Sequence, residues 1–174
     1  MGKIALVTGG SRGIGRAIVL KLAEAGCDVA LLYHNSHEEA EAVCQSARAL
    51  GRKALAIQAD VGDPQSVVEG VTAFRGVFGR VDFLISNAAI GVLRPALELT
   101  LKHWRRCLET NALALNTLAQ QVVPLMPSGG RMIALSSLGA LRAIPHYAFI
   151  GASKAARSEE RRVGKECRSW WAAY

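Results

Sequence analysis

The feature that most constrains the fold of this chain is a regular alternation of short apolar runs with longer segments of helical periodicity. The segments with helical periodicity cover residues 16–26, 37–51, 66–79 and 100–125. The apolar runs between them are KIALVT (3–8), DVALLY (28–33), KALAIQAD (53–60), VDFLISN (81–87) and RMIALSS (131–137). Strands that alternate with helices are typical of a parallel sheet, and strands covered on both faces need not alternate apolar with polar residues. The sequence therefore predicts an α/β fold with a doubly wound parallel sheet.

Two predicted helices carry recognisable start signals. Ser36 followed by Glu39 predicts a capping box at the start of the second helix. Asp63 followed by Pro64 predicts a capping carboxylate with proline at the first helical position of the third helix. Neither signal requires a functional explanation.

Length and composition limit the classes of protein to which the chain can belong. The chain has 174 residues, which is enough for one core and too few for two ordinary domains. Its net charge of +7 suits a phosphate-bearing ligand or an acidic partner, but scattered Lys and Arg without interleaved aromatic residues argue against nucleic-acid binding. Four cysteines without a CxxC and four histidines without ligand spacing predict neither disulfides nor a metal site. No signal peptide or membrane span is recognisable, so a cytoplasmic protein is expected.

A glycine-rich stretch, TGGSRGIG (8–15), follows the first apolar run and opens the first predicted helix. Glycines at such a turn let the backbone approach a pyrophosphate, whose charge then lies at the helix N-terminus. The alternative is a tight strand-to-helix connection without a ligand. The cofactor-binding residues predicted in this stretch are Gly9, Ser11, Arg12, Gly13, Ile14 and Gly15.

The end of the second apolar run indicates which nucleotide is bound. NAD-binding relatives of this fold carry an acid there that holds the adenosine ribose, whereas LLYHNSH contains no acid before Glu38. The guanidinium of Arg12 could face a 2′-phosphate, with Asn35, His34 and Ser36 as companions. The sequence therefore predicts NADPH, with NADH as the less favoured cofactor.

Six stretches in order resemble the short-chain dehydrogenase/reductase family over residues 3–156. They are TGGSRGIG, the pair Asp60-Val61, SNAA (86–89), NALALN (111–116), ALSS (134–137) and HYAFIGASKAA (146–156). The resemblance implies hydride transfer with a nicotinamide cofactor, and a homotetramer with interfaces on the helix from Thr100 and the helix carrying Lys154. By matching position it implies adenine contacts for Asp60 and Val61, a place in the cofactor cleft for Asn87 and Ala88, and support of a catalytic water for Asn111.

The usual family member has its tyrosine four residues before the lysine, but here Ile150 occupies that position and Tyr147 precedes Lys154 by seven. On one helix either spacing leaves both side chains on one face, and the longer one moves the tyrosine about 4.5 Å along the axis. A ketone needs its acid at the oxygen of the carbon that receives hydride. A conjugated enoyl thioester receives hydride on its β-carbon, while charge gathers on an oxygen three bonds away. A displaced phenol suits the second reaction.

The other predicted catalytic residues act around this tyrosine. Lys154 would hydrogen-bond the nicotinamide ribose, and its charge would favour ionisation of the phenol. Ser137 would orient substrate or cap the strand before it. The basic residues Lys102, Arg105 and Arg106 would either meet a carrier protein or solvate their helix.

SNAAIGVLRPALELTLKHW and SSLGALRAIPHYAFIGASKAA further resemble the NADPH-dependent enoyl-acyl-carrier-protein reductases of this family. The chain departs from that subtype at Ser86, where asparagine is usual, and at Asn35, where an arginine meets the 2′-phosphate. The resemblance implies reduction of trans-2-enoyl thioesters in fatty-acid synthesis, with acyl carrier protein or coenzyme A as the carrier. The alternatives are a 3-oxoacyl or hydroxysteroid-type carbonyl reductase and an inactive nucleotide-binding fragment.

The end of the chain differs in character from the rest. In RSEERRVGKECRSWWAAY (157–174) no apolar residue occurs between Ala156 and Val163, so the preceding amphipathic pattern stops. Within it, RSEERRVGKECRS (157–169) also resembles a translated sequencing adapter. We therefore expect a dinucleotide-binding reductase domain at 1–156, truncated after the fifth strand and the start of the following helix, and a non-native tail at 157–174. A solvated helix end is the alternative. A chain truncated in this way is expected to be weakly folded or inactive.

Overall fold

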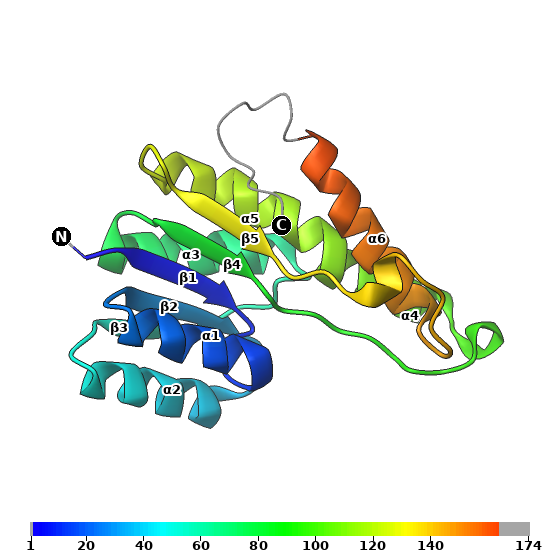
Figure 1. Ribbon diagram of the computed structural model, residues 1–174, viewed down its shortest axis with the longest axis horizontal. Helices are drawn as coiled ribbons and strands as arrows, with labels where there is room; N and C mark the ends of the chain where they lie inside the picture. The colour runs from blue at the N-terminus through cyan, green and yellow to red at the C-terminus, as the bar shows by residue number, and fades with distance from the viewer. Residues whose placement is uncertain (1, 164–174) are drawn as a thin grey trace.

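The computed structural model describes residues 2–163 and contains a five-stranded parallel sheet. The strand order is β3-β2-β1-β4-β5, and neighbouring strands pair in parallel throughout (Figure 1). The strands are β1 (Ile4–Thr8), β2 (Asp28–Tyr33), β3 (Ala54–Gln58), β4 (Phe83–Ser86) and β5 (Arg131–Ala134). The predicted doubly wound sheet is confirmed.

Helices cover the two faces of the sheet. The longer helices are α1 (Gly13–Glu24), α2 (His37–Ala49), α3 (Pro64–Phe78), α4 (Leu101–Leu108), α5 (Ala114–Val122) and α6 (Ala148–Val163). Shorter turns are the 3-10 helices η1 (Ala96–Glu98), η3 (Val123–Leu125) and η4 (Leu138–Ala140), and the π-helical turn η2 (Glu109–Leu113). The helix expected over residues 100–125 is therefore divided into α4, η2, α5 and η3.

Two hydrophobic clusters, one on each face, hold these layers together. Along β1, Ile4 and Leu6 belong to the cluster under α3 and α5, whereas Ala5 and Val7 belong to the cluster under α1 and α2. All four side chains are at most 7% exposed. Burial on both faces explains why the strand reads as a continuous apolar run.

Of the two capping signals predicted from the sequence, the structure confirms one. Asp63 caps α3 by accepting a hydrogen bond from the Gln65 N–H at 3.0 Å, with Pro64 at the first helical position, as predicted. The predicted capping box at Ser36 is wrong, because Ser36 lies at the N-cap of α2 without a side-chain capping hydrogen bond. Its backbone (φ −92°, ψ 69°) is not in the extended conformation typical of a capping serine.

Helix α6 extends past the predicted domain boundary at residue 156. It continues to Val163, and Arg157 is buried and donates a hydrogen bond to the Ser86 carbonyl oxygen. Residues 164–174 of the predicted non-native tail lie outside the described residues, so that expectation stays a prediction.

Membrane-spanning helices and clusters of metal ligands are absent from residues 2–163. Every helix within residues 2–163 is too short or too polar to cross a bilayer. These residues also contain no group of three or more His, Cys, Asp or Glu side chains able to hold a metal ion.

Asp82 joins the start of β4 to the start of β1 in the interior. It is 1% exposed, accepts a hydrogen bond from the Ile4 N–H at 2.9 Å, and lies 3.1 Å from Lys3 Nζ and 3.4 Å from Arg80 Nη2. Burial alone would raise the pKa of Asp82, but the Ile4 N–H, Lys3 and Arg80 together hold it below its ordinary value of 3.8.

We predict that Asp82→Asn lowers the free energy of unfolding by about 2 kcal/mol at neutral pH, because Lys3 and Arg80 lose their carboxylate partner. A lowered pKa in the folded protein means that this stabilisation is present above pH ~4 and is lost as pH falls through the folded pKa. Urea unfolding from neutral to acidic pH should therefore show the two proteins converging. A difference that does not change with pH would contradict the prediction.

Candidate active site

The strand order reverses between β1 and β4, and a cavity of about 470 Å³ opens beyond the carboxyl ends of the strands. Most of the residues predicted to bind the cofactor line it: Gly9, Ser11, Arg12, Ile14, Gly15, Asn35, Asp60, Val61, Asn87 and Ala88. Gly13 and Lys154 are not part of this lining. The cavity therefore collects residues from four separate strand ends and from the first turn of α1.

The glycine-rich turn brings the backbone at Gly9 and Gly15 into close approach. Gly9 has φ +66°, a conformation that favours glycine. A Cβ added at Gly15 would lie 2.0 Å from the Gly9 carbonyl oxygen and 2.6 Å from Asn87 Nδ2. Because the first N–H groups of a helix have no partner within the helix, this close approach makes the start of α1 suited to a phosphate group.

Asn87 and Thr8 fasten the end of β4 to this turn. Asn87 Nδ2 donates to the carbonyl oxygens of Thr8 at 2.9 Å and Gly9 at 3.1 Å. The Thr8 hydroxyl oxygen accepts from the backbone N–H groups of Asn87 and Ala88, both at 3.0 Å. Four hydrogen bonds thus join the end of β1 to the end of β4, where the strand order reverses, and hold this wall of the cavity.

Asp60, at the far side of the cavity, belongs to a charged cluster. Its Oδ1 accepts from the Gly62 N–H at 2.9 Å, and its Oδ2 accepts from Arg106 Nη2 at 2.7 Å and lies 3.6 Å from His34 Nε2. Burial alone would raise the pKa of Asp60, but Arg106, the Gly62 N–H and His34 hold it below 3.8.

Arg106 and Thr110 are among the lining residues that the sequence did not predict as cofactor-binding residues. Arg106 was grouped with other basic residues of its helix, and nothing local indicates a partner 46 positions away. Thr110 lies in η2, its hydroxyl oxygen is buried, and it has no hydrogen-bond partner among the described residues.

Tyr147 keeps contact with Ser137 despite its displaced position in the sequence. Its hydroxyl donates to Ser137 Oγ at 3.1 Å, and Ser137 Oγ also accepts from the Gly139 N–H at 3.2 Å. Gly139 lies against the phenol ring, since a Cβ there would be 2.4 Å from Tyr147 Cδ1. Ser137 therefore both caps η4 and contacts the tyrosine.

The expected placement of Tyr147 within the lysine-bearing helix needs correction. Tyr147 precedes the first residue of α6, although the Gly151 N–H donates to its carbonyl oxygen at 2.7 Å. The cause is a bend at His146, whose φ of +60° lies in the left-handed region and interrupts any helix there. The shared helix face and the axial displacement expected for two side chains on one regular helix therefore do not apply to Tyr147 and Lys154.

Ile150 fills the position where the family's tyrosine usually stands. It is 8% exposed and packs onto Gly91, where a Cβ would lie 2.2 Å from both Cγ1 and Cδ1 of the isoleucine. Position 150 therefore offers apolar packing and no acid.

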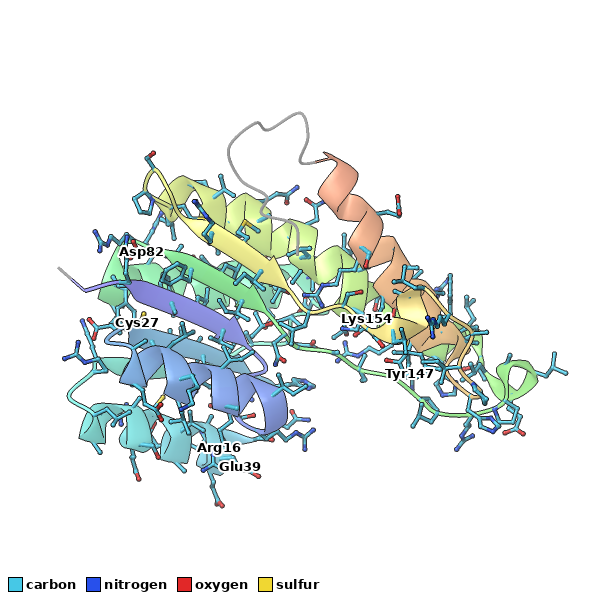
Figure 2. The ribbon with its side chains drawn as sticks, viewed as in Figure 1. Arg16, Cys27, Glu39, Asp82, Tyr147 and Lys154 are labelled. Atoms are coloured by element: carbon cyan, nitrogen blue, oxygen red, sulfur yellow. The ribbon has the colours of Figure 1, made fainter. Side chains whose placement is uncertain are left out.

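Lys154 and Asn111 are both buried in the same region. Lys154 is 5% exposed and donates from Nζ to the Leu135 carbonyl oxygen at 3.0 Å. Burial, with a smaller effect of the Arg157 charge, lowers the pKa of Lys154 to about 8. Figure 2 shows Lys154 and Tyr147 toward the same end of the molecule, beyond the sheet.

Asn111 joins α6 to the segment after β4. Its Oδ1 accepts from the Ile90 N–H at 2.8 Å, and its Nδ2 donates to the Ile90 carbonyl oxygen at 2.8 Å and to Ser153 Oγ at 2.9 Å. Because Ile90 lines the cavity, this residue connects the cavity wall with the helix that carries Lys154.

The family model for short chain dehydrogenases matches residues 3–161, and the chain belongs to this family. It is 39% identical to hydroxynaphthalene reductase arp2 of Aspergillus fumigatus, covering 89% of this chain and 57% of that protein. It is 40% identical to 1-cyclohexenylcarbonyl-CoA reductase of Streptomyces collinus (88% and 55%) and 38% identical to a 3-oxoacyl-acyl-carrier-protein reductase of Staphylococcus epidermidis (89% and 64%). The chain thus spans less than two thirds of these relatives' lengths.

Solved structures agree with this assignment. A blue fluorescent protein from a metagenomic library, in complex with NADPH, has a TM-score of 0.90 and 40% identity, over 95% of this chain and 68% of that one. A short chain dehydrogenase from Burkholderia cenocepacia, in complex with NADP, has a TM-score of 0.91 and 38% identity, over 98% and 71%.

The lowered pKa of Lys154 has a consequence for stability. In the unfolded chain the ammonium group has its ordinary pKa of 10.5, so between about pH 8 and 10.5 the unfolded state binds more protons than the folded state. We predict that the free energy of unfolding gains up to about 3 kcal/mol from this group across that window. The Lys154→Met variant should lack this gain in urea unfolding, and an equal rise in both proteins would contradict the prediction.

Proposed function

We propose that this chain carries the cofactor-binding and catalytic residues of an NADPH-dependent reductase of trans-2-enoyl thioesters, with the acyl group borne by acyl carrier protein or coenzyme A. One observation carries the choice of substrate. Tyr147 retains a hydrogen bond to Ser137 from its displaced position, while Ile150 fills the usual tyrosine position with an apolar side chain packed on Gly91.

The residues around the cavity fit a phosphate-bearing dinucleotide. The turn at Gly9 and Gly15 and the start of α1 would hold the pyrophosphate. Asn35 and Arg12 would lie toward the 2′-phosphate, and Asp60 toward adenine. NADPH is favoured over NADH because β2 ends without an acid, and because the similar structures named above were solved with NADPH or NADP.

Bound NADPH would supply the hydride that reaches the substrate's β-carbon. With substrate bound, the Tyr147 hydroxyl would donate its one proton to the thioester oxygen, where negative charge develops. The Ser137 hydroxyl, which accepts from Tyr147 in this structure, would then donate to the phenol oxygen and keep the phenol in place. Lys154 would hold the nicotinamide ribose and favour ionisation of the phenol. Water or Tyr147 would supply the proton to the α-carbon, and Asn111 would support the water.

The relatives' names favour two substrate classes. The Streptomyces collinus relative is named for 1-cyclohexenylcarbonyl-CoA, in which a ring double bond is conjugated with a thioester carbonyl. This name supports an enoyl substrate. The second candidate is a carbonyl reductase, because the Staphylococcus epidermidis relative is named for 3-oxoacyl-acyl-carrier-protein and a similar structure is an angucycline C-6 ketoreductase with bound NADP. A nucleotide-binding fragment without activity is a third hypothesis.

The substrate prediction is tested by NADPH oxidation with crotonyl and acetoacetyl thioesters. We expect the crotonyl thioester to give a kcat/KM at least about tenfold higher, because position 150, where the family's acid for a ketone usually stands, holds an isoleucine packed on Gly91. Turnover of the ketone alone would favour the carbonyl reductase. NADPH binding without turnover of either thioester would favour the inactive fragment.

We predict that Tyr147→Phe lowers kcat for the crotonyl thioester about 10²- to 10³-fold, which is typical of losing a donor to a developing oxyanion. The Kd for NADPH, measured by fluorescence titration, should change little, since Tyr147 does not line the cavity. Ser137→Ala should reduce kcat less, because it removes only the group that orients the phenol. Unchanged turnover in the phenylalanine variant would exclude the assigned role.

A further inference from the structure

A single carboxylate, that of Asp60, lies among the described residues lining the cavity, together with two guanidinium groups, those of Arg12 and Arg106. The Asp60 carboxylate lies close to the end of β2, because His34 Nε2 is 3.6 Å from its Oδ2. His34 and Asn35 line the same cavity, and this segment is where we propose the 2′-phosphate lies. An uncompensated carboxylate here would repel that phosphate.

Arg106 compensates this charge from a different element. It projects from α4, and its Nη2 donates to Asp60 Oδ2 at 2.7 Å while the Gly62 N–H holds Oδ1 at 2.9 Å. The guanidinium lies over Gly62, where an added Cβ would be 2.9 Å from Nη1. The side chain of Arg106 is 35% exposed and that of Asp60 23%, so water screens the pair only in part. The carboxylate is therefore fixed in orientation and paired with one opposite charge.

We propose that Arg106 is a positioning residue that sets the preference for NADPH over NADH by neutralising Asp60, whose carboxylate faces the adenine and so lies near the 2′-phosphate of the same adenosine. The inference rests on the proposed binding of a nicotinamide dinucleotide in this cavity. The two dinucleotides differ only in the 2′-phosphate, so the charge of the Asp60–Arg106 pair affects their affinities unequally. A purely structural contribution of Arg106 would affect both affinities alike.

The unaltered chain, two single variants and their double variant separate the effect of charge from a structural effect of Arg106. The pair is neutral in the unaltered chain, carries −1 in Arg106→Gln, +1 in Asp60→Asn, and is neutral again in the double variant. The ratio of the NADH Kd to the NADPH Kd should fall about three- to tenfold in Arg106→Gln and rise by a similar factor in Asp60→Asn. In the double variant it should return to within about twofold of the unaltered chain, even if both affinities are weaker.

The measurement is a fluorescence titration of the full chain with NADPH and with NADH, at low ionic strength and about pH 8, where histidine side chains are ordinarily neutral. Arg105→Gln is the matched control, because it removes the same charge from the adjacent, exposed position of α4. Its ratio should stay within about twofold of the unaltered value. Arg106→Lys should restore part of the preference, since it restores charge without the planar guanidinium.

Several outcomes would overturn the inference. Equal loss of both affinities in Arg106→Gln without recovery of the ratio in the double variant would assign Arg106 a structural role only. An equal fall of the ratio in Arg105→Gln would assign the effect to net charge. If Arg106→Gln does not fold, as judged by circular dichroism, an unchanged ratio in Asp60→Asn still overturns it. Absence of binding of either dinucleotide to the unaltered chain would instead overturn the proposed cofactor site.

Discussion

Asn87 holds the glycine-rich turn against the end of β4 through a side-chain amide that donates to the carbonyl oxygens of Thr8 and Gly9. The Thr8 hydroxyl oxygen accepts hydrogen bonds from the backbone N–H groups of Asn87 and Ala88. These bonds join the two halves of the sheet where the strand order reverses, which is where the cavity opens. Because a partly buried carbonyl without a partner is costly, the amide fixes the turn and with it the start of α1.

Buried charge is concentrated in the helix beyond the cavity. Lys154 and Arg157 lie three residues apart on α6, and both are at most 5% exposed. Lys154 donates to the Leu135 carbonyl oxygen and Arg157 to the Ser86 carbonyl oxygen. Burial, with a smaller effect of the Arg157 charge, lowers the pKa of Lys154 to about 8. An anionic ligand that approached Lys154 would favour its protonated form, so ligand binding and protonation of this lysine are coupled.

The displaced tyrosine shows how a contact can persist when its position in the chain changes. The left-handed His146 turns the chain immediately before α6, so Tyr147 reaches Ser137 from outside the helix. Gly139 leaves room for the phenol ring, and Gly91 leaves room for Ile150. Gly139 and Gly91, in separate segments, thus leave room for a tyrosine at position 147 and an isoleucine at position 150. A methyl group on either glycine would collide with that side chain.

Local patterns in the sequence were sufficient for the succession of strands and helices along the chain and for the glycine-rich turn, whereas Asp60, Val61, Asn87 and Ala88 of the cavity wall followed from the family resemblance. Period, capping residues and glycine placement act over a few positions, so they can be recognised without knowledge of the fold. The same local rule failed at Ser36, whose backbone departs from the capping conformation. The pairing of Asp60 with Arg106, the contact of Tyr147 with Ser137 and the unpartnered hydroxyl of Thr110 were decided only by the tertiary structure. Each depends on which side chains meet after distant segments pack, and no spacing within one segment determines that.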